Sequence, residues 1–281
     1  MKATPTLRGT FSISSILDGS ATVQLQDWTT GVSDSIKLTS IGTYTSAKET
    51  VTVKIVQSSA FPVLNSAINF RTGELDFNSS GTLSIDGRDH DINNVLLPPS
   101  SNDRCGASVS TSADTSELVP SHASQINGTS DVLVDAAIAN PQTFAAGLIS
   151  HADYTLTGTY TSPQTWGSPS SPKIVYCNGE VEFKGNCTGW GILLINGEEF
   201  ESKGTFTFYG LVMFYNANDD EVEWETKCQM TIVGGLILSG SSEVEYKSEA
   251  QAYINYSKQA LDLAKTRSSG GGGLAVSNWS D

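Results

Sequence analysis

A short apolar pattern recurs along the chain between residues 173 and 247. The apolar triplets occupy residues 174–176, 192–194, 211–213 and 236–238, at steps of 18, 19 and 25 residues. A glycine directly precedes each of the last three triplets, namely Gly191, Gly210 and Gly235. A repeat of about 20 residues with short strands and glycine turns is typical of a β-solenoid, in which each coil must stack on its neighbours to bury its apolar face.

The first 60 residues follow a different period. Apolar and polar residues alternate at period 2 in the segments 11–13, 21–25, 36–38 and 51–56, with turn residues between them. This alternation predicts strands with one apolar face, and the turns predict an antiparallel β meander over residues 1–60. A sheet with one apolar face needs a covering layer, and no segment among these residues supplies one.

Residues 61–97 hold short strands separated by glycine turns, so we expect the solenoid to span 61–247, with an insert at 98–171. Apolar residues then recur at helical spacing, which predicts a capping helix and a docking tail over 248–281. The predicted fold class is therefore mainly β. A small antiparallel sheet is followed by an interrupted β-solenoid with a loop and helix insert, and then by a C-terminal capping helix.

The insert itself has three parts. Its polar sequence predicts a loop over 98–130, and apolar residues at helical spacing predict a helix over 131–150, divided by Pro141. Strand character returns at 154–161.

Composition narrows the classes of partner. The chain has 281 residues and a net charge of −14, yet only 16% of its residues are charged. Nucleic acid is not expected as a partner, because phosphate binding needs clustered Lys and Arg. No apolar run is long enough to span a membrane and no signal peptide is recognisable, so we expect no membrane span in this chain.

Four cysteines are present, at Cys105, Cys177, Cys187 and Cys228, and none forms a C-x-x-C pair. An even number in a Ser- and Thr-rich chain predicts one or two disulfides in an exported protein. The four allow three pairings, among which the sequence does not choose. The alternative is that some of them are buried thiols.

Several segments together resemble a known family. The runs 186–197 and 204–212, with their glycines before Ile192 and Leu211, resemble the repeat core of PilX-like type IV pilus-assembly proteins. Three further segments, listed here, resemble that family in the same order: Leu38–Tyr44, Ser84–Asp91 and Val276–Trp279. The resemblance covers nearly the whole chain.

The resemblance implies a protein similar to the minor pilins. In such proteins an N-terminal hydrophobic helix anchors the subunit or packs in the pilus core, and a β-rich domain lies outside. The chain as given carries no such helix, and the uncovered meander of residues 1–60 is where one would lie. The implied partners are other pilin subunits or a separately encoded N-terminal helix, and the implied location is the cell surface or an extracellular filament.

A cluster of carboxylates in residues 86–91 is a candidate metal site. Asp86, Asp89, His90 and Asp91 offer oxygen ligands of the kind that Ca²⁺ prefers and a histidine that suits a transition metal. The segment lacks the EF-hand pattern. Its Asp-Gly pair is also a turn signal, with carboxylates that bond to the local backbone. We otherwise expect no cofactor.

Aromatic residues gather in the coils, and Trp190 and Trp224 are candidate ligand-binding residues. On an exposed solenoid face they would stack against sugar rings, as in a carbohydrate-binding adhesin that recognises a surface glycan. Inward aromatic stacks are the ordinary core of a solenoid, however, and alternation sends about half of these residues inward.

Residues for catalysis are sparse. The three histidines stand in no recognisable catalytic motif, and neither G-x-S-x-G nor H-E-x-x-H occurs. The glutamates that remain as acid/base pairs are Glu182, Glu198, Glu199, Glu201 and Glu225, which are equally the solvated outer positions of strands. We therefore expect a non-catalytic pilin-like component that acts through surface packing and adhesion. The alternatives are a carbohydrate-binding adhesin and a β-helix polysaccharide enzyme.

Overall fold

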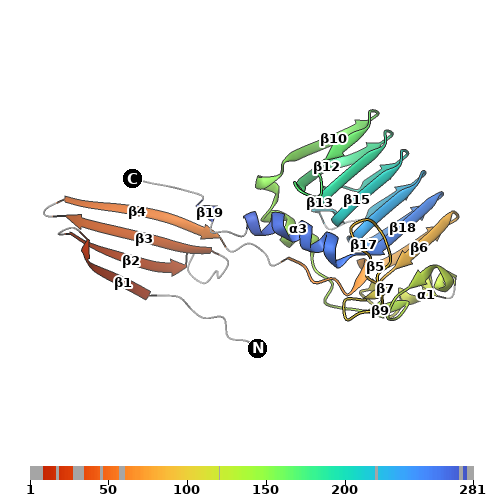
Figure 1. The fold of residues 1–281 in the computed structure, drawn as a ribbon, viewed down its shortest axis with the longest axis horizontal. Coiled ribbons are helices and arrows are strands. Elements are labelled where there is room, and N and C mark those ends of the chain that lie inside the picture. Colours follow the sequence, from red (N-terminus) through yellow and green to blue (C-terminus); the bar gives the residue numbers. More distant parts are fainter. Residues whose placement is uncertain are drawn as a thin grey trace. The chain divides into compact units, whose positions relative to one another are not determined.

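The computed structural model describes residues 9–16, 19–27, 35–44, 47–56, 61–119, 121–218, 221–271 and 275–276. The chain divides into two compact units (Figure 1). The smaller unit combines Met1–Ser59 with Gly270–Asp281, and the larger unit is Ala60–Ser269. In sequence, the larger unit is therefore inserted between two segments of the smaller one.

The smaller unit is an antiparallel sheet with the strand order β1-β2-β3-β4-β19. Its strands are β1 Gly9–Ile16, β2 Gly19–Asp27, β3 Ser35–Tyr44, β4 Ala47–Val56 and β19 Ala275–Val276. The predicted small antiparallel sheet is thus confirmed. The chain returns after the larger unit and pairs its last described strand with β4.

The register of this sheet separates apolar from polar rows. Leu25 pairs with Leu38, and Leu38 pairs with Val53. In the neighbouring row Thr39 pairs with Thr52. Directly paired residues lie on the same face of a sheet and successive residues on opposite faces, so the Leu and Val row and the Thr row belong to different faces.

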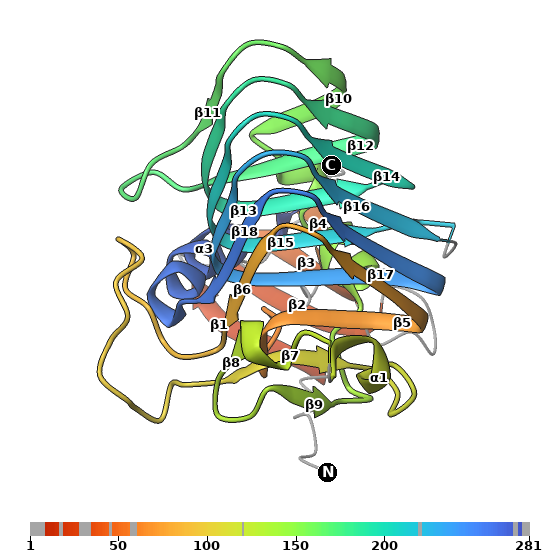
Figure 2. The ribbon, with the colours of Figure 1, turned by 90° about the vertical axis from the view of Figure 1, so that its right-hand side faces the viewer.

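The larger unit is a second sheet, in which the described residues form 14 strands and every pairing between strands is parallel. The strands are β5 Ser66–Ser79, β6 Thr82–Asp86, β7 Cys105–Val109, β8 Ile126–Asn127, β9 Val132–Val134, β10 Tyr154–Tyr160, β11 Gln164–Trp166, β12 Lys173–Phe183, β13 Cys187–Asn196, β14 Glu199–Ser202, β15 Phe206–Tyr215, β16 Val222–Thr226, β17 Met230–Ser248 and β18 Gln251–Tyr256. The sheet closes around one core (Figure 2).

The pairings group the strands into three faces. The first face runs β10-β12-β13-β15-β17-β5-β7-β9. The second face runs β10-β12-β14-β16-β17-β5, and the third runs β11-β13-β15-β17-β18-β6-β8. We call the segments at one level of the three faces a rung. Figure 1 shows the rungs stacked from β10 at one end to β9 at the other.

The rungs do not follow the order of the chain. The last complete rung, β17 with β18, lies against the first, β5 with β6. After β6 the chain adds β7, β8 and β9 at one end, and then passes through residues 135–153 to start again at β10 at the other end. Residues 98–171, expected as an insert, therefore hold five strands that belong to the same sheet, β7 to β11.

The described residues form three α-helices beside the sheet: α1 Thr115–Leu118, α2 Pro141–Ala146 and α3 Lys258–Gly271. Two 3-10 helices span Ala123–Gln125 and Ile149–His151. The helix predicted over 131–150 is wrong in its first half, which contains strand β9. Pro141 does not divide a helix but begins α2, with Asn140 as its N-cap, because proline at the first position lacks only an N–H that has no partner there. A helix is present in the C-terminal part, as predicted, but it begins only at Lys258. Residues 251–256, expected in its first part, form strand β18 instead.

A column of glycines stacks at one corner of the rungs. Gly191, Gly210 and Gly234 pair in register and have φ values of 121°, 137° and 141°. The sequence pattern assigned Gly235 to this column, one residue too far along. Gly235 instead pairs with Leu211, and its missing side chain leaves room for Leu64. The apolar triplet 236–238 therefore pairs with residues 212–214, one residue beyond the start of the triplet 211–213.

Candidate functional surface

A five-residue motif, Glu-x-Glu-x-Lys, recurs on the second face. Its four copies span 180–184, 199–203, 223–227 and 243–247, on β12, β14, β16 and β17. The residue between the two glutamates is buried in each copy: Val181, Phe200, Trp224 and Val244. Alternation along a strand therefore directs the glutamates and lysines outward. Each copy contributes two glutamates and one lysine, so this surface carries an excess of carboxylates.

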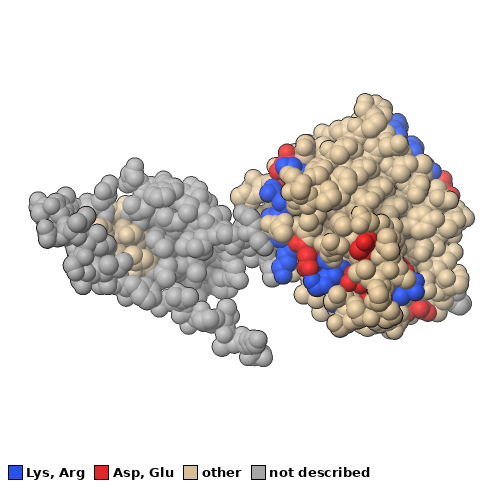
Figure 3. Space-filling model, in the orientation of Figure 1, with Lys and Arg blue, Asp and Glu red and all other residues tan. Residues whose placement is uncertain are grey.

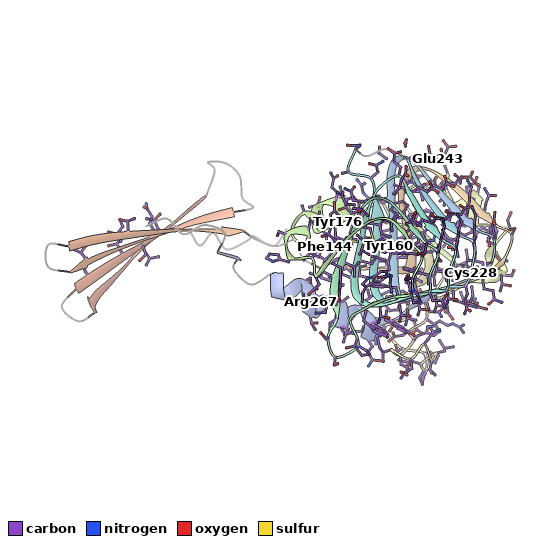
Figure 4. All side chains as sticks on the ribbon, turned by 90° about the horizontal axis from the view of Figure 1, so that it is seen from above. Phe144, Tyr160, Tyr176, Cys228, Glu243 and Arg267 are labelled. Carbon is purple, nitrogen blue, oxygen red and sulfur yellow. The ribbon has the colours of Figure 1, made fainter. Side chains whose placement is uncertain are left out.

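The register aligns the first three copies position by position and offsets the fourth copy by two residues, so that the glutamates form rows. Glu182, Glu201 and Glu225 pair in sequence across β12, β14 and β16. In the adjacent row Glu199 pairs with Glu223 and Glu223 pairs with Glu245. We call these side chains and the four motif lysines the carboxylate rows. Glu243, labelled in Figure 4, lies at the outer margin of the rungs.

The motif lysines hold the rows together across neighbouring strands. Lys203 Nζ lies 2.6 Å from Glu182 and 2.8 Å from Glu201. Lys227 Nζ lies 2.8 Å from Glu201 and 2.9 Å from Glu225. Each lysine thus joins its own strand to the preceding one. Like carboxylates directly opposite each other would repel, and the lysines between them offset that repulsion.

The lysines also change how the carboxylates titrate. The hydrogen bond from Lys203 lowers the pKa of Glu182 to about 2, with Lys184 adding to the effect. For Glu201, desolvation acts to raise the pKa, but hydrogen bonds from Lys203 and Lys227 outweigh it, so the pKa is lowered. These two carboxylates stay ionised under mildly acidic conditions.

Glu199 and Glu243 are not among the glutamates that pair with the motif lysines. Desolvation and the neighbouring charge of Glu223 raise the pKa of Glu199. Desolvation and the charge of Glu221 raise the pKa of Glu243. A hollow of about 380 Å³ is lined by five carboxylates: Glu180, Glu198, Glu199, Glu221 and Glu223. The field there favours cations and basic groups.

One trio of these carboxylates has the spacing of a cation site. Oxygens of Glu199, Glu201 and Glu225 all lie within 4.8 Å of one another. The two oxygens of Glu201 already accept hydrogen bonds from Lys203 and Lys227, and Glu225 pairs with Lys227. A cation would have to displace these ammonium groups, so the trio acts first as a partner of the lysines.

The sequence offered a signal for these rows. The motif Glu-x-Glu-x-Lys recurs four times in the printed sequence, and Glu74-Leu75-Asp76-Phe77-Asn78 is a weaker fifth copy. Its glutamates, and Glu198 beside them, are predicted to occupy solvated outer positions of strands. Glu198 is exposed and Glu182, Glu199 and Glu225 are partly exposed, but Glu201 is buried. The alignment of the copies across strands becomes visible only with the register.

The predicted metal site occupies the loop between β6 and β7. Asp86 accepts hydrogen bonds from the Arg88 guanidinium, with the closest pair of atoms 2.6 Å apart. Asp89 is buried, accepts from the backbone N–H of Lys258 at 2.9 Å, and so caps the start of α3. Asp91 accepts from two local backbone N–H groups. These bonds match the turn alternative, and the metal site stays a prediction.

His90 belongs to the same loop. Its Nδ1 lies 2.8 Å from the carbonyl oxygen of Arg88, and its Nε2 lies 3.8 Å from Asp86. The side chain is buried. Both nitrogens therefore face groups of the loop itself.

The two candidate tryptophans have different surroundings. Trp224 is fully buried, stacks on Phe200 at a centroid distance of 4.2 Å, and donates a hydrogen bond to Thr226. It belongs to the core and has no exposed ring face for a sugar. Trp190 is half-buried and stacks in parallel on Tyr209, with centroids 5.2 Å apart.

All four cysteines are free thiols. The disulfides predicted from their even number are not formed in this structure. Cys177 and Cys187 are buried in the core, and burial raises the pKa of the Cys187 thiol to about 11. The alternative of buried thiols describes these two, which behave as small apolar residues. Cys105 and Cys228 are partly exposed.

The face of the larger unit seen in Figure 3 is mostly free of charged side chains. No helix among the described residues is both long and apolar enough to cross a membrane.

Comparisons with known proteins find little. No protein-family model matches the chain, and no curated protein matches it. Among solved structures, the competence-associated pilin ComZ from Thermus thermophilus aligns at 12% sequence identity with a TM-score of 0.23. The alignment covers 86% of this chain and 79% of that chain. A TM-score of this size does not establish a common fold.

Proposed function

We propose that this protein is a non-catalytic, pilin-like component of a type IV pilus or a related extracellular filament. The observation that carries the proposal is the smaller unit. Its sheet has an apolar row, Leu25-Leu38-Val53, on one face and a Thr row on the other. Apart from Gly270 and Gly271 at the end of α3, the described residues of this unit lie in its five strands.

An apolar sheet face is stable in water only when a partner covers it. The sequence resemblance to pilus-assembly proteins supplies a partner of the right chemistry, a long hydrophobic helix of a pilin. Such a helix comes from another subunit or from a separately encoded segment. The protein then works outside the cytoplasm, at the cell surface.

In this proposal the larger unit is a β-solenoid that the filament displays. Stacked parallel rungs with an aromatic core form a rigid support, and their outward residues form the surface that meets other molecules. The carboxylate rows and the face seen in Figure 3, where charged side chains are few, offer two different kinds of contact surface.

The apolar face is tested by a pair of substitutions on adjacent residues of β3. Leu38→Glu places a charge on the face with the apolar row, and Thr39→Glu places the same charge on the opposite face. We expect Leu38→Glu to abolish recovery of the protein in sheared filaments, while Thr39→Glu is recovered normally. Circular dichroism of both purified variants controls for folding. Equal recovery of two folded variants would contradict the proposal.

One observation favours a second candidate, a glycan-binding adhesin. The half-buried Trp190 and Tyr209 rings stack in parallel on neighbouring strands, and such rings stack well on sugars. We expect Trp190→Ala to abolish any binding on a glycan array, while the fold persists. Binding that survives this substitution, or no binding by the wild type, would remove the adhesin from consideration.

A further inference from the structure

The rung that contains β10 and β11 ends the stack with an unpaired edge. Among the described residues, β10 pairs only with β12 and β11 pairs only with β13. At the opposite end of the stack, helix α1 lies against β5 and β9. The two ends therefore differ, and only the β10 end presents a complete rung of strands to solvent.

Strand β10 lacks the usual protection against pairing, although Pro163 stands between β10 and β11. Natural edge strands carry lysine, proline or a covering helix, which discourage the addition of another strand. Strand β10 is uncharged and rich in Thr and Tyr, with Thr155, Thr157 and Thr159 exposed. Tyr154 is 40% exposed. One local bond blocks part of the edge, from the Thr157 N–H to the Tyr160 hydroxyl at 3.1 Å.

The sequence of β10 reads nearly the same in both directions. It is Tyr-Thr-Leu-Thr-Gly-Thr-Tyr, centred on Thr157, and only Leu156 and Gly158 break the symmetry. An antiparallel copy paired about Thr157 would place Tyr154 opposite Tyr160 and Thr155 opposite Thr159. Aromatic pairs and Thr-Thr pairs across strands both stabilise a sheet.

The inward-facing residues of β10 from the two copies also fit together in this antiparallel arrangement. Leu156 is buried and pairs with buried Cys177, and Gly158 pairs with buried Val181, so both positions lie over the core. The symmetric pairing would bring Leu156 of one copy against Gly158 of the other, where the glycine leaves room. Figure 4 views the larger unit from the β10 end and shows Tyr160 inside the outline of the rungs.

The bend of the strand lies next to the proposed twofold axis at Thr157. β10 turns from the first face to the second at Gly158, which has a φ of 72°. A twofold axis through this corner exchanges the first and second faces and returns the third face to itself. Strand β11 would then meet its own copy, and all three segments of the rung would pair at once.

We propose that two copies of this chain associate head to head through the β10–β11 edge, as a twofold dimer with a continuous core. The chain has a net charge of −14, so two copies repel over most of their surfaces, and the uncharged edge is where that repulsion is least. This inference goes beyond the proposed function and does not depend on it. It concerns self-association of the isolated protein.

Cysteine cross-linking tests the axis. The full chain with Cys105→Ser and Cys228→Ser serves as background, because these two native thiols are partly exposed. Thr157→Cys places two thiols at the axis within disulfide reach, so we expect a covalent dimer on mild oxidation. Thr155→Cys alone should give none, because Thr159 lies opposite it, and Thr155→Cys with Thr159→Cys should restore cross-linking. Equal cross-linking by the Thr157→Cys and Thr155→Cys variants would overturn the proposed pairing.

Self-association is measured by sedimentation equilibrium of the full chain. We expect a dimer whose Kd rises about tenfold or more in Thr157→Lys, because two like charges meet at the axis. Ser242→Lys, at an exposed position of β17 away from this edge, adds the same charge as a control and should leave the Kd unchanged. A monomer at every concentration, or a dimer indifferent to Thr157→Lys, would overturn the proposal.

Discussion

The ammonium group of Lys227 lies 2.8 Å from a carboxylate oxygen of Glu201 on the neighbouring strand. Lys203 binds the other oxygen of the same carboxylate. A single glutamate thus receives one lysine from its own rung and one from the next, and the motif Glu-x-Glu-x-Lys repeats this connection along the second face. Glu199 and Glu243 are not bonded to these lysines, and desolvation together with neighbouring carboxylates raises the pKa of each.

This difference predicts how stability depends on pH. The lowered pKa of Glu182, about 2, means that its ion pair stabilises the fold above the ordinary glutamate pKa of 4.5. That contribution is lost as the pH falls from about 4.5 towards about 2. The thermal unfolding midpoint should fall on acidification from about pH 5 to about pH 2.5, a range set by these two pKa values. We expect this fall to be smaller in the Glu182→Gln variant than in the wild type. Parallel thermal profiles of the two proteins would contradict this.

Glu199 should behave in the opposite sense. Its pKa is raised by desolvation and by Glu223, so its ionised form destabilises the fold at neutral pH. We expect Glu199→Gln to increase the free energy of unfolding at pH 7 by about 0.5 kcal/mol or less, since the group is still partly in contact with solvent. Urea denaturation measures this change. A loss of stability in this variant would show that Glu199 has a partner that offsets its charge.

The two tryptophans should differ in their contribution to stability. Trp224 is fully buried against Phe200, so Trp224→Ala is expected to cost about 4 kcal/mol in the free energy of unfolding. Trp190→Ala should cost clearly less, because Trp190 is only half-buried. Urea denaturation of the two variants gives the comparison, and equal losses would contradict the assignment of Trp224 alone to the core.

The glycine column gives a prediction about backbone geometry. A Cβ at Gly210 would lie 2.0 Å from the carbonyl oxygen of Gly191, and the φ of Gly210 is 137°. Gly210→Ala should therefore cost about 3 kcal/mol or more. Gly179 also has a positive φ, 88°, but nothing lies near its missing Cβ, so Gly179→Ala should cost only about 1 kcal/mol. Thermal unfolding of both variants separates the clash from the backbone strain.

Asp89 should act on helix α3 across a long sequence separation. Its carboxylate is buried and accepts from Lys258 N–H and from the Asn102 amide. Asp89→Ala should cost about 2 kcal/mol and speed hydrogen exchange in the first turn of α3. Asp91→Ala, which removes only local turn bonds, serves as the control and should leave exchange in α3 unchanged. Unchanged exchange in the Asp89→Ala variant would contradict the capping role.

The period of the sequence was enough to predict two parts of the fold. Alternation at period 2 predicted the small antiparallel sheet, and the apolar triplets predicted parallel stacking of short strands. Both depend on local patterns, which a single sequence displays directly. Gly235 was assigned to the wrong column because two glycines stand together, and only the pairing of Gly234 with Gly210 separates them.

The order of the rungs could not be predicted from the sequence. The contact of β17 with β5 depends on where the chain returns after residues 135–153, and no local pattern records this. Trp190 and Trp224 looked alike as aromatic residues of the coils, and only their position relative to the core distinguishes them. The carboxylates at Asp86, Asp89 and Asp91 suggested metal ligation, because sequence does not show that backbone and Arg88 groups already bond to them.

The central claim is that the protein is part of a filament at the cell surface. Shearing the source cells and probing the sheared filaments, membranes and medium with antibody to this chain tests it most directly. We predict that the chain co-purifies with the filaments. Recovery of the chain only in the medium or the cytoplasm, with none in the filament fraction, would contradict the account.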